Sequence, residues 1–362
     1  MTVFSAIPNA LGSPIAAAAS AAHDVLVKLF PSQSSSLDLA LEASLAKYGL
    51  TDADDGIDVG RQAAACVKAR VDADNVKRAL PDTFIGTTTT PPSWLPGEWQ
   101  PTSTTISGAP AGMTAQFISV FTPFAMNDPT QFRASQAPPT LESGAYTKAY
   151  NEVKALGAKE NSSRTDDQTK IGNFFAGSPP AYWNGAVQGL VVERALDLGD
   201  TARLFALLNI SLGDAIITAW DSKIAWNFWR PITGIHNGDH DGNPNTVGDP
   251  PNGSYAGWQP LFGTPNYPDY TSGANNLAGA AATTVANFFG TDEVHFFLKN
   301  SLIAGPDGVR EYFFCSAAAQ DVVDGRIYMG IHFRFADAVA LRQGTRVANW
   351  VFGHYLRPIG SN

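Results

Sequence analysis

Three separated stretches decide the fold of this chain, and the first is Lys223-Ile-Ala-Trp-Asn-Phe-Trp-Arg230-Pro231. The second is Tyr270-Thr271-Ser272-Gly273-Ala274, and the third is Arg326-Ile-Tyr-Met-Gly-Ile-His332. Between them they supply one lysine, two arginines, a Ser-Gly turn and one histidine. Fixed cations, N–H donors and an imidazole suit a tetrahedral or trigonal-bipyramidal oxyanion. The three stretches together therefore predict a cage for one oxyanion.

The spacing inside each stretch predicts how its side chains are presented. Lys223 and Arg230 are seven residues apart, so a continuous helix would point both to nearly the same side. Ser272-Gly273 precedes a run of small residues that predicts a helix, and a serine with N–H groups at a helix start favours an anion. Arg326 and His332, six residues apart, converge only if the chain bends between them, which a glycine at 330 allows.

The ordered motifs Lys-x6-Arg-Pro, Ser-Gly and Arg-x5-His resemble the signature of the vanadium-dependent haloperoxidase and type 2 phosphatidic acid phosphatase (PAP2) superfamily. The flanking words Asn227-Phe-Trp-Arg-Pro-Ile-Thr and Tyr328-Met-Gly-Ile-His-Phe-Arg-Phe look like its bacterial haloperoxidase-like branch. The resemblance covers Asp200 to Pro358 well and the N-terminal half loosely. It implies an all-α helical bundle of the vanadium haloperoxidase type, with long loops over the active-site end.

The resemblance also implies a role for each cage residue. Vanadate, or phosphate in the same site, would be held by Lys223, Arg230, Ser272, Gly273, Arg326 and His332. His332 resembles the axial protein ligand of vanadium in haloperoxidases and the nucleophile on phosphorus in phosphatases, and both roles need a neutral imidazole. Trp220 and Tyr267 stand where relatives place aromatic residues near the halide, although each equally suits a core or loop position.

The sequence departs from the family pattern at residue 274. The family pattern that this chain resembles has a proton-transferring histidine at this position, and this chain has Ala274. Gly325 and Thr271 also replace the serine and the proline that are usual in the pattern. Loss of a general acid–base removes about 10²–10⁴ in rate. The nearest substitutes in sequence are Asp269, His236 and His240.

The resemblance implies a haloperoxidase-like oxidoreductase that uses hydrogen peroxide and a halide, bromide or iodide rather than chloride, and passes the oxidising equivalent to a small organic acceptor. Two alternatives stay open because of Ala274. One is a non-redox member of the family, an isomerase or an oxyanion-binding protein. The other is an acid-phosphatase-like hydrolase. Relatives are often homodimers or larger, and the residues themselves do not decide this.

Composition excludes several other classes. The 362 residues carry a net charge of −9, with 44% hydrophobic and 16% charged residues, which indicates a soluble globular protein without a basic stripe for nucleic acid. The sequence contains no run of 18 or more apolar residues, so we expect no membrane span. The Ala-rich patch at 16–22 has no basic start, so we expect no signal peptide. Secreted, periplasmic and cytoplasmic locations all stay open.

The resemblance implies one haloperoxidase-like domain over 1–362. N-terminal helices and a wrapping loop are expected in 1–142, and the core with the cage is expected in 143–362. Helices are predicted over 16–29, 37–48, 56–74, 144–158, 164–176, 180–197, 200–228, 272–289, 292–301, 307–324 and 335–356. Two long loops, 82–142 and 232–270, separate them. The first loop should be packed, because it carries the apolar anchors Trp94, Trp99, Phe117, Phe121 and Phe124.

Other polar residues favour ordinary structural roles. Asp239-x-Asp241-x-Asn243 resembles the start of a calcium loop, but Pro250 occupies the position of the usual final glutamate, so a polar turn is expected. His236 and His240 lack a third metal ligand at a clear spacing. Cys66 and Cys315 are expected to be buried thiols rather than a disulfide. Asp337 follows His332 by five residues, so a backbone carbonyl is the expected partner of the imidazole.

Overall fold

The structure is a computed structural model that describes residues 10–78, 95–102 and 112–357. Its chain divides into two compact units, Met1–Leu80 and Pro81–Asn362. The single domain over 1–362, with its N-terminal part in 1–142 and its core in 143–362, therefore stays a prediction. In the first unit, α1 packs against both other helices around Ala16, Leu45 and Ile57. These helices are α1 (Pro14–Leu29), α2 (Ser34–Ala46) and α3 (Gly56–Arg78), with a short 3-10 turn, η1 (Pro31–Gln33), after α1.

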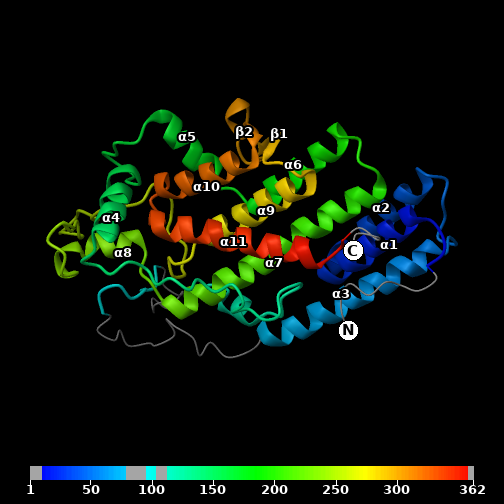
Figure 1. Ribbon diagram of the computed structural model, residues 1–362, viewed down its shortest axis with the longest axis horizontal. Helices are drawn as coiled ribbons and strands as arrows, with labels where there is room; N and C mark the ends of the chain where they lie inside the picture. The colour runs from blue at the N-terminus through cyan, green and yellow to red at the C-terminus, as the bar shows by residue number, and fades with distance from the viewer. Residues whose placement is uncertain (1–9, 79–94, 103–111, 358–362) are drawn as a thin grey trace. The chain divides into compact units, whose positions relative to one another are not determined.

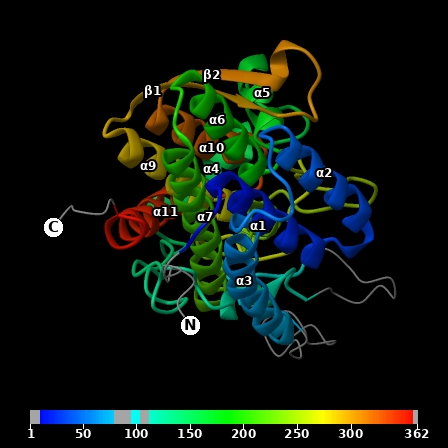
Figure 2. The same cartoon turned by 90° about the vertical axis from the view of Figure 1, so that its right-hand side faces the viewer.

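The second unit is a helical bundle with one small hairpin, as Figure 1 shows. Three long helices, α7 (Leu198–Trp226), α9 (Gly273–Phe289) and α11 (Arg334–His354), lie side by side in both views (Figures 1 and 2). The remaining helices of this unit are α4 (Gly144–Leu156), α5 (Asp166–Phe174), α6 (Pro179–Glu193), α8 (Pro231–His236) and α10 (Cys315–Tyr328). Short 3-10 turns are η2 (Gln116–Val120), η3 (Gly238–His240) and η4 (Pro306–Gly308). The predicted all-α bundle is confirmed in outline.

Helix α7 forms the middle of this bundle. Asp197 caps its start, with the carboxylate accepting a hydrogen bond of 2.8 Å from the backbone N–H of Asp200. Leucine and isoleucine on most of its faces are buried against α6, α9 and α11. Among the described helices, only α7 is long and apolar enough to cross a membrane, and 56% of its apolar window is buried inside the protein, as in a core helix.

Small residues let α9 and α11 approach each other closely. A Cβ at Gly279 would lie 2.2 Å from the carbonyl oxygen of Leu341, and a Cβ at Gly344 would lie 2.0 Å from that of Asn276. Neither distance leaves room for a methyl group, so the glycines set the spacing of the two helices. The run of alanine and glycine after residue 273 therefore serves close packing as well as helix formation.

The hairpin corrects two predicted helices. Residues 292–301 and the start of 307–324 form antiparallel strands β1 (Glu293–Lys299) and β2 (Val309–Phe314). Val294, Phe296 and Leu298 are buried while their neighbours are not, which is the period-two pattern of a half-buried strand. Helix α10 therefore begins only at Cys315.

The long connections are partly ordered by short helices. Residues predicted as an unbroken loop over 232–270 contain α8 and η3. In the first loop, Trp99 is buried, and the rings of Phe117 and Phe121 lie 5.4 Å apart, which agrees with a packed segment. Residues 82–94, with Trp94, and 103–111 lie outside the described residues.

Candidate active site

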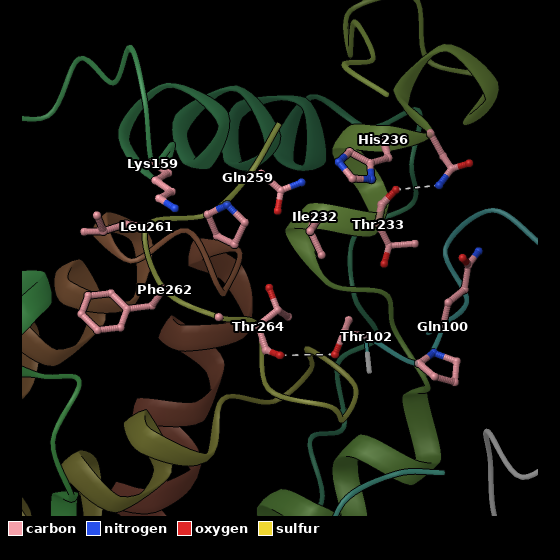
Figure 3. A pocket seen from close by; sticks show the side chains of 14 residues that line it. Gln100, Thr102, Lys159, Ile232, Thr233, His236, Gln259, Leu261, Phe262 and Thr264 are labelled. Carbon is pink, nitrogen blue, oxygen red and sulfur yellow. Dashed lines mark hydrogen bonds between the residues drawn. The ribbon is translucent and has the colours of Figure 1, made fainter. Parts of the chain in front are cut away.

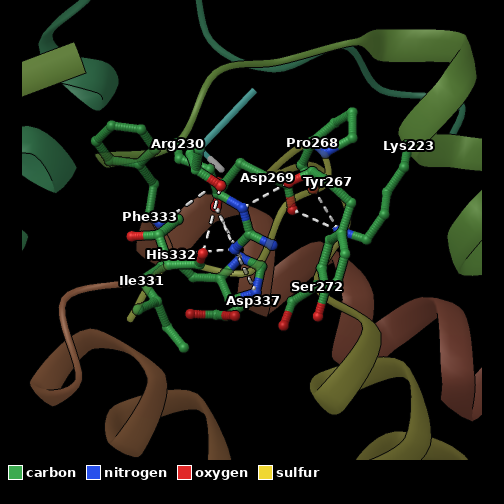
Figure 4. A network of polar contacts seen from close by, with 12 residues as sticks. Lys223, Arg230, Tyr267, Pro268, Asp269, Ser272, Ile331, His332, Phe333 and Asp337 are labelled. Atoms are coloured by element: carbon green, nitrogen blue, oxygen red, sulfur yellow. Dashed lines mark hydrogen bonds and ion pairs between the residues drawn. The ribbon is translucent and has the colours of Figure 1, made fainter. Parts of the chain in front are cut away.

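The last turn of α7 positions Lys223, which is fully buried. Its Nζ donates to the carbonyl oxygens of Pro268 at 2.6 Å and Asp269 at 3.1 Å (Figure 4). The helix ends because Asn227 adopts φ +43°, a left-handed conformation that asparagine tolerates, and its N–H donates to the carbonyl of Lys223. Lys223 is thus fixed against the loop that precedes α9.

Arg230 lies outside α7, which ends at Trp226, close to the end predicted at residue 228, so the two side chains do not share a continuous helix. Arg230 is extended, with φ −84° and ψ 159°, and Pro231 begins α8 directly after it. The ring of a proline disfavours helical backbone in the residue before it, which explains the break. The two side chains still converge, because Arg230 Nε donates to the carbonyl of Tyr267 at 2.7 Å, beside the acceptors of Lys223.

His332 is placed by the predicted bend. Helix α10 ends at Tyr328, and Gly330 adopts φ +79°, which favours glycine. A Cβ at Gly330 would also lie 2.4 Å from the carbonyl oxygen of Gly157. The chain therefore reverses within a few residues and brings His332, just before α11, back towards Arg230.

Asp269 lies beside His332 with its carboxylate, in addition to the backbone hydrogen bond that was expected. Asp269 Oδ1 lies 2.7 Å from His332 Nδ1, and both side chains are buried. Arg230 Nη1 lies 3.0 Å from His332 Nε2 and 3.3 Å from Nδ1, and a guanidinium has only donors. Because the carboxylate next to Nδ1 has only acceptors when charged, the arrangement favours the tautomer with its proton on Nδ1 and a lone pair on Nε2. The sequence offered Asp269 only as a substitute acid.

Burial sets the charges in this cluster. It lowers the pKa of His332 well below its usual value, helped by the nearby charges of Arg230 and Lys223. It raises the pKa of Asp269 to about 7, against the attraction of Arg230. Burial also lowers the pKa of Lys223 far below its ordinary range, and that of Arg230 to a lesser degree. The imidazole is therefore neutral at neutral pH, and the cations lack sufficient counter-charge.

The two arginines carry unpaired donors. Arg230 Nη2 and Arg326 Nε are buried without a hydrogen-bond partner among the described residues. Arg326, on α10, makes two long contacts from Nη1, to the carbonyl of Phe175 at 3.4 Å and to Met329 Sδ at 4.0 Å, and the residue is 9% exposed. Its charge still lowers the pKa of Lys223, Arg230 and His332. Arg326 therefore belongs electrostatically to the same cage.

The start of α9 forms another wall. Ser272 is its N-cap, and its side chain makes no capping bond but accepts a 3.2 Å hydrogen bond from Asn275 Nδ2. The first N–H groups of any helix have no intrahelical partner and favour anions. A Cβ at Gly273 would lie 2.9 Å from the ring of Trp220, so glycine is needed for this helix end to reach α7.

The structure adds Asp337, which sequence spacing had set aside. Helix α11 begins at Arg334, after His332, so the two residues do not share a helix and their spacing of five carries no information. Asp337 is fully buried and accepts a 2.7 Å hydrogen bond from Asn275 Nδ2, whose amide also reaches Ser272 Oγ at 3.2 Å. A charged residue among buried positions of a predicted helix was the signal that could have found it.

A buried network of side-chain hydrogen bonds lies next to the cage. Thr271 Oγ1 donates to Gln343 Oε1 at 2.7 Å, and Gln343 Nε2 donates to Ser222 Oγ at 2.8 Å. Asn276 Nδ2 in turn donates to Thr271 Oγ1 at 3.1 Å. Threonine in place of the usual proline at 271 therefore ties α7, α9 and α11 together next to Lys223.

Trp220 and Tyr267 come together beside Lys223, and their role at a halide site stays a prediction. Their ring centres lie 4.9 Å apart, and Lys223 Nζ lies 4.8 Å from the centre of the Tyr267 ring. The guanidinium of Arg230 also lies 4.7 Å from that ring. The two aromatics thus make an electron-rich apolar wall against the cations.

The two other candidate acids, His236 and His240, lie elsewhere. His236 Nε2 contacts the carbonyl of Trp258 at 2.8 Å, and the side chain lines a pocket of about 560 Å³ (Figure 3). His240 is exposed on η3. The structure brings neither into contact with Lys223, Arg230 or His332.

The remaining sequence candidates have structural partners. Asp239 accepts from the N–H of Gly248, and Asp241 accepts from Asn243 N–H and the Thr246 hydroxyl, which is the polar turn that was expected. No group of three or more potential metal-binding side chains occurs within the described parts of the chain. Cys66 is a partly buried thiol and Cys315 a fully buried one, and they are not bonded to each other.

The cage fits an oxyanion on the chemistry of its donors. Two buried guanidinium groups have unsatisfied N–H donors, and burial disfavours the charge of Lys223 in the absence of an anion. An oxyanion would supply the acceptors and the negative charge that these groups lack. Vanadate and phosphate share this shape and charge, so the cage does not distinguish between them.

Comparisons with known proteins show which sequences and folds this chain resembles. Residues 203–361 match the family model of the VCPO second helical-bundle domain. Vanadium chloroperoxidase of Curvularia inaequalis is 30% identical over 183 residues, which cover 42% of this chain and 29% of that protein. A bacterial vanadium-dependent iodoperoxidase superposes with a TM-score of 0.73 at 24% identity, covering 93% of this chain and 79% of the other.

A second solved structure, a holo-type bacterial vanadium-dependent chloroperoxidase, gives a TM-score of 0.64 at 15% identity over 93% of this chain and 80% of the other. These TM-scores establish the fold, and the stretch matched in the curated relative is less than a third of that protein's length. Residues 203–361, which contain every residue of the cage, resemble the VCPO second helical-bundle domain, and the chain has the fold of the bacterial vanadium haloperoxidases.

Proposed function

We propose that this chain is a vanadium-dependent haloperoxidase-like enzyme that oxidises bromide or iodide, rather than chloride, with hydrogen peroxide. The observation that carries the proposal is the pair of buried arginines, Arg230 and Arg326, with unpaired donors beside a neutral imidazole. Relatives named as vanadium chloroperoxidase and iodoperoxidase support it. Vanadate would be held by Lys223, Arg230, Ser272, Gly273, Arg326 and His332.

Bound vanadate supplies a Lewis-acid centre that activates peroxide towards the halide. The protein's part is to hold and neutralise the anion. Arg230 and Arg326 would meet its oxygens with their unpaired donors, and Lys223 would add charge. His332 would offer Nε2, while Asp269, 2.7 Å from Nδ1, would orient the imidazole, as carboxylates beside metal-bound histidines do. Because Arg230 Nη1 contacts Nε2 here, it must give up that contact when the ligand binds.

The halide would approach along the wall formed by Trp220 and Tyr267, where cations attract it and rings exclude water. A small organic acceptor would take the pocket in Figure 3. Thr233 and Thr264 line that pocket; Thr233 lies three residues after Arg230 of the cage, and Thr264 lies three residues before Tyr267 of the aromatic wall. The pocket is thus built from the segments that enter the cage.

Turnover of bromide and iodide should depend on vanadate in phosphate-free buffer, with peroxide present. Arg326→Ala should abolish this turnover and the binding of vanadate, because it removes an unpaired donor and a charge. Arg310→Ala is the matched control, since Arg310 pairs with Asp321 and Tyr312 beside the hairpin. Vanadate binding by the wild type without peroxidase turnover would instead favour the non-redox or phosphatase alternatives, which hydrolysis of a phosphate monoester separates.

A further inference from the structure

Asp337 is a buried carboxyl group for which the cage chemistry has so far no use. Its side chain has 0% exposure, and Oδ1 accepts a 2.7 Å hydrogen bond from Asn275 Nδ2. Oδ2 is buried without a hydrogen-bond partner among the described residues. Figure 4 draws Asp337 in the same cluster as His332 and Ser272. The carboxyl therefore has one oxygen held in place and one oxygen uncommitted.

The groups around Asp337 come from every side of the cage. Asp269 on the loop before α9 and Arg326 on α10 act on it electrostatically, and Lys223 on α7 is influenced by Asp337 in turn. From α9 it meets the amide of Asn275, and the Ser272 hydroxyl lies near it without an aligned hydrogen bond. Burial, followed by the charge of Asp269, raises the pKa of Asp337 well above its usual value. The carboxyl is therefore protonated over a pH range in which ordinary aspartates are not.

We propose that Asp337 is the proton donor and acceptor of the anion cage, supplying from α11 the function that alanine at residue 274 cannot supply from α9. The inference rests on the proposed function, because it assumes an oxyanion between Arg230 and Arg326. It differs from the sequence-based candidates. Asp269 is committed to His332 Nδ1, and His236 and His240 lie outside the cage.

Asp337 would both donate and accept the proton that the reaction needs. An oxygen that leaves the cage as water needs a proton, and the Asp337 O–H bond breaks to provide it, leaving a carboxylate. Incoming hydrogen peroxide brings a proton that must be removed as it binds, and the carboxylate takes it, which restores the acid. No electrons move to or from Asp337, and the oxidant is the peroxide of the proposed reaction.

Asn275 positions this carboxyl. Its Nδ2 donates to both Asp337 Oδ1 and Ser272 Oγ, so one amide orients the acid relative to the serine at the helix start. A purely structural explanation is that a carboxylate near the N-terminus of α9 stabilises the helix dipole. That role needs the charged form, whereas a proton donor needs the neutral form, so the two explanations predict different protonation.

The test uses the full-length protein with Asp337→Asn, which keeps the shape and burial but cannot exchange a proton. Infrared difference spectra of wild type against the variant at neutral pH should show the carbonyl band of a protonated carboxylic acid. Calorimetric binding of inorganic phosphate, in buffers of different ionisation enthalpy, should show a change in the number of protons exchanged. Vanadate-dependent turnover should fall by about 10²–10⁴, as for loss of a general acid–base.

Asp241→Asn is the matched control, because Asp241 is another buried carboxyl with a raised pKa, in the turn after α8. It should leave proton exchange and turnover unchanged. Asp337→Asn with wild-type proton exchange and turnover would overturn the inference and leave the proposed function standing. A wild type that binds neither phosphate nor vanadate would overturn both. The double variant Ala274→His/Asp337→Asn should recover turnover relative to Asp337→Asn alone.

Discussion

At the scale of single residues, the contact between His332 and Asp269 decides what the imidazole can do. A proton held on Nδ1 leaves Nε2 as the nitrogen that can bind a metal or attack phosphorus. Burial of both groups, together with the arginine on Nε2, keeps the imidazole neutral. The chemistry of His332 therefore depends on a residue that lies 63 positions away in the chain.

Asp269→Asn should weaken vanadate binding by about 10–100-fold, because the variant loses the carboxylate that orients and polarises the His332 imidazole. Calorimetric titration with vanadate measures the change. Asp239→Asn, in the turn that bonds Gly248, is the control and should bind vanadate as the wild type does. Equal affinity in Asp269→Asn and the wild type would show that Asp269 does not support the ligand.

Sequence alone identified the cations, the serine turn and His332 because they form short ordered motifs. It could not assign Asp269 and Asp337 their places, since their partners are distant in sequence: Asp269 meets His332, and Asp337 meets Asn275. Helical spacing was applied to Asp337 across a point where no helix exists. Contacts of this kind depend on tertiary packing that periodicity does not encode.

At the scale of elements, the close crossing of α9 and α11 holds the side chains of these two helices together at the cage. Both helices contribute directly, Ser272 and Asn275 from the start of α9 and Asp337 from α11. Their close approach at Gly279 and Gly344 leaves no space for a Cβ. Any widening of this crossing would separate Asn275 from Asp337.

Gly344→Ala should destabilise the protein by about 1–3 kcal/mol, because the new methyl group meets the backbone oxygen of Asn276. Thermal or denaturant unfolding measures the loss. Gly353→Ala on the same helix is the control, since nothing lies within 4 Å of a Cβ there, and it should be neutral or stabilising by up to about 1 kcal/mol. Equal effects of the two substitutions would contradict the close crossing.

Most helices were predictable from periodicity and caps, and the hairpin was not. The segment Glu293–Lys299 follows a helix and contains alternating apolar residues, so a helical prediction over 292–301 ignored its period of two. The end of α7 at Trp226 agrees with the end predicted at residue 228, although the left-handed conformation of Asn227 that terminates the helix was not predicted.

At the scale of the whole molecule, buried titratable groups should shape stability against pH. Asp269 and Asp337 have raised pKa values, so their contribution is complete at acidic pH and is lost as pH rises through the folded pKa, about 7 for Asp269. Lys223 and His332 have lowered pKa values and act in the opposite sense, favouring the fold at higher pH.

The Tm of Asp337→Asn should therefore fall less than that of the wild type as pH rises, because the variant has no carboxyl to ionise at this buried position. Thermal unfolding across a pH series, at constant ionic strength and without phosphate, measures both slopes. Parallel curves for the two proteins would mean that Asp337 does not carry a raised pKa in the folded state.

The most direct test of the account is a crystal structure of the protein soaked with vanadate in phosphate-free buffer. We predict one vanadate between Arg230 Nη2 and Arg326 Nε, with Lys223 and the Ser272 turn around it and His332 Nε2 facing vanadium. Arg230 Nη1 should have left Nε2. Protein that takes up vanadate only at its surface, with Arg230 still on His332, would contradict the cage.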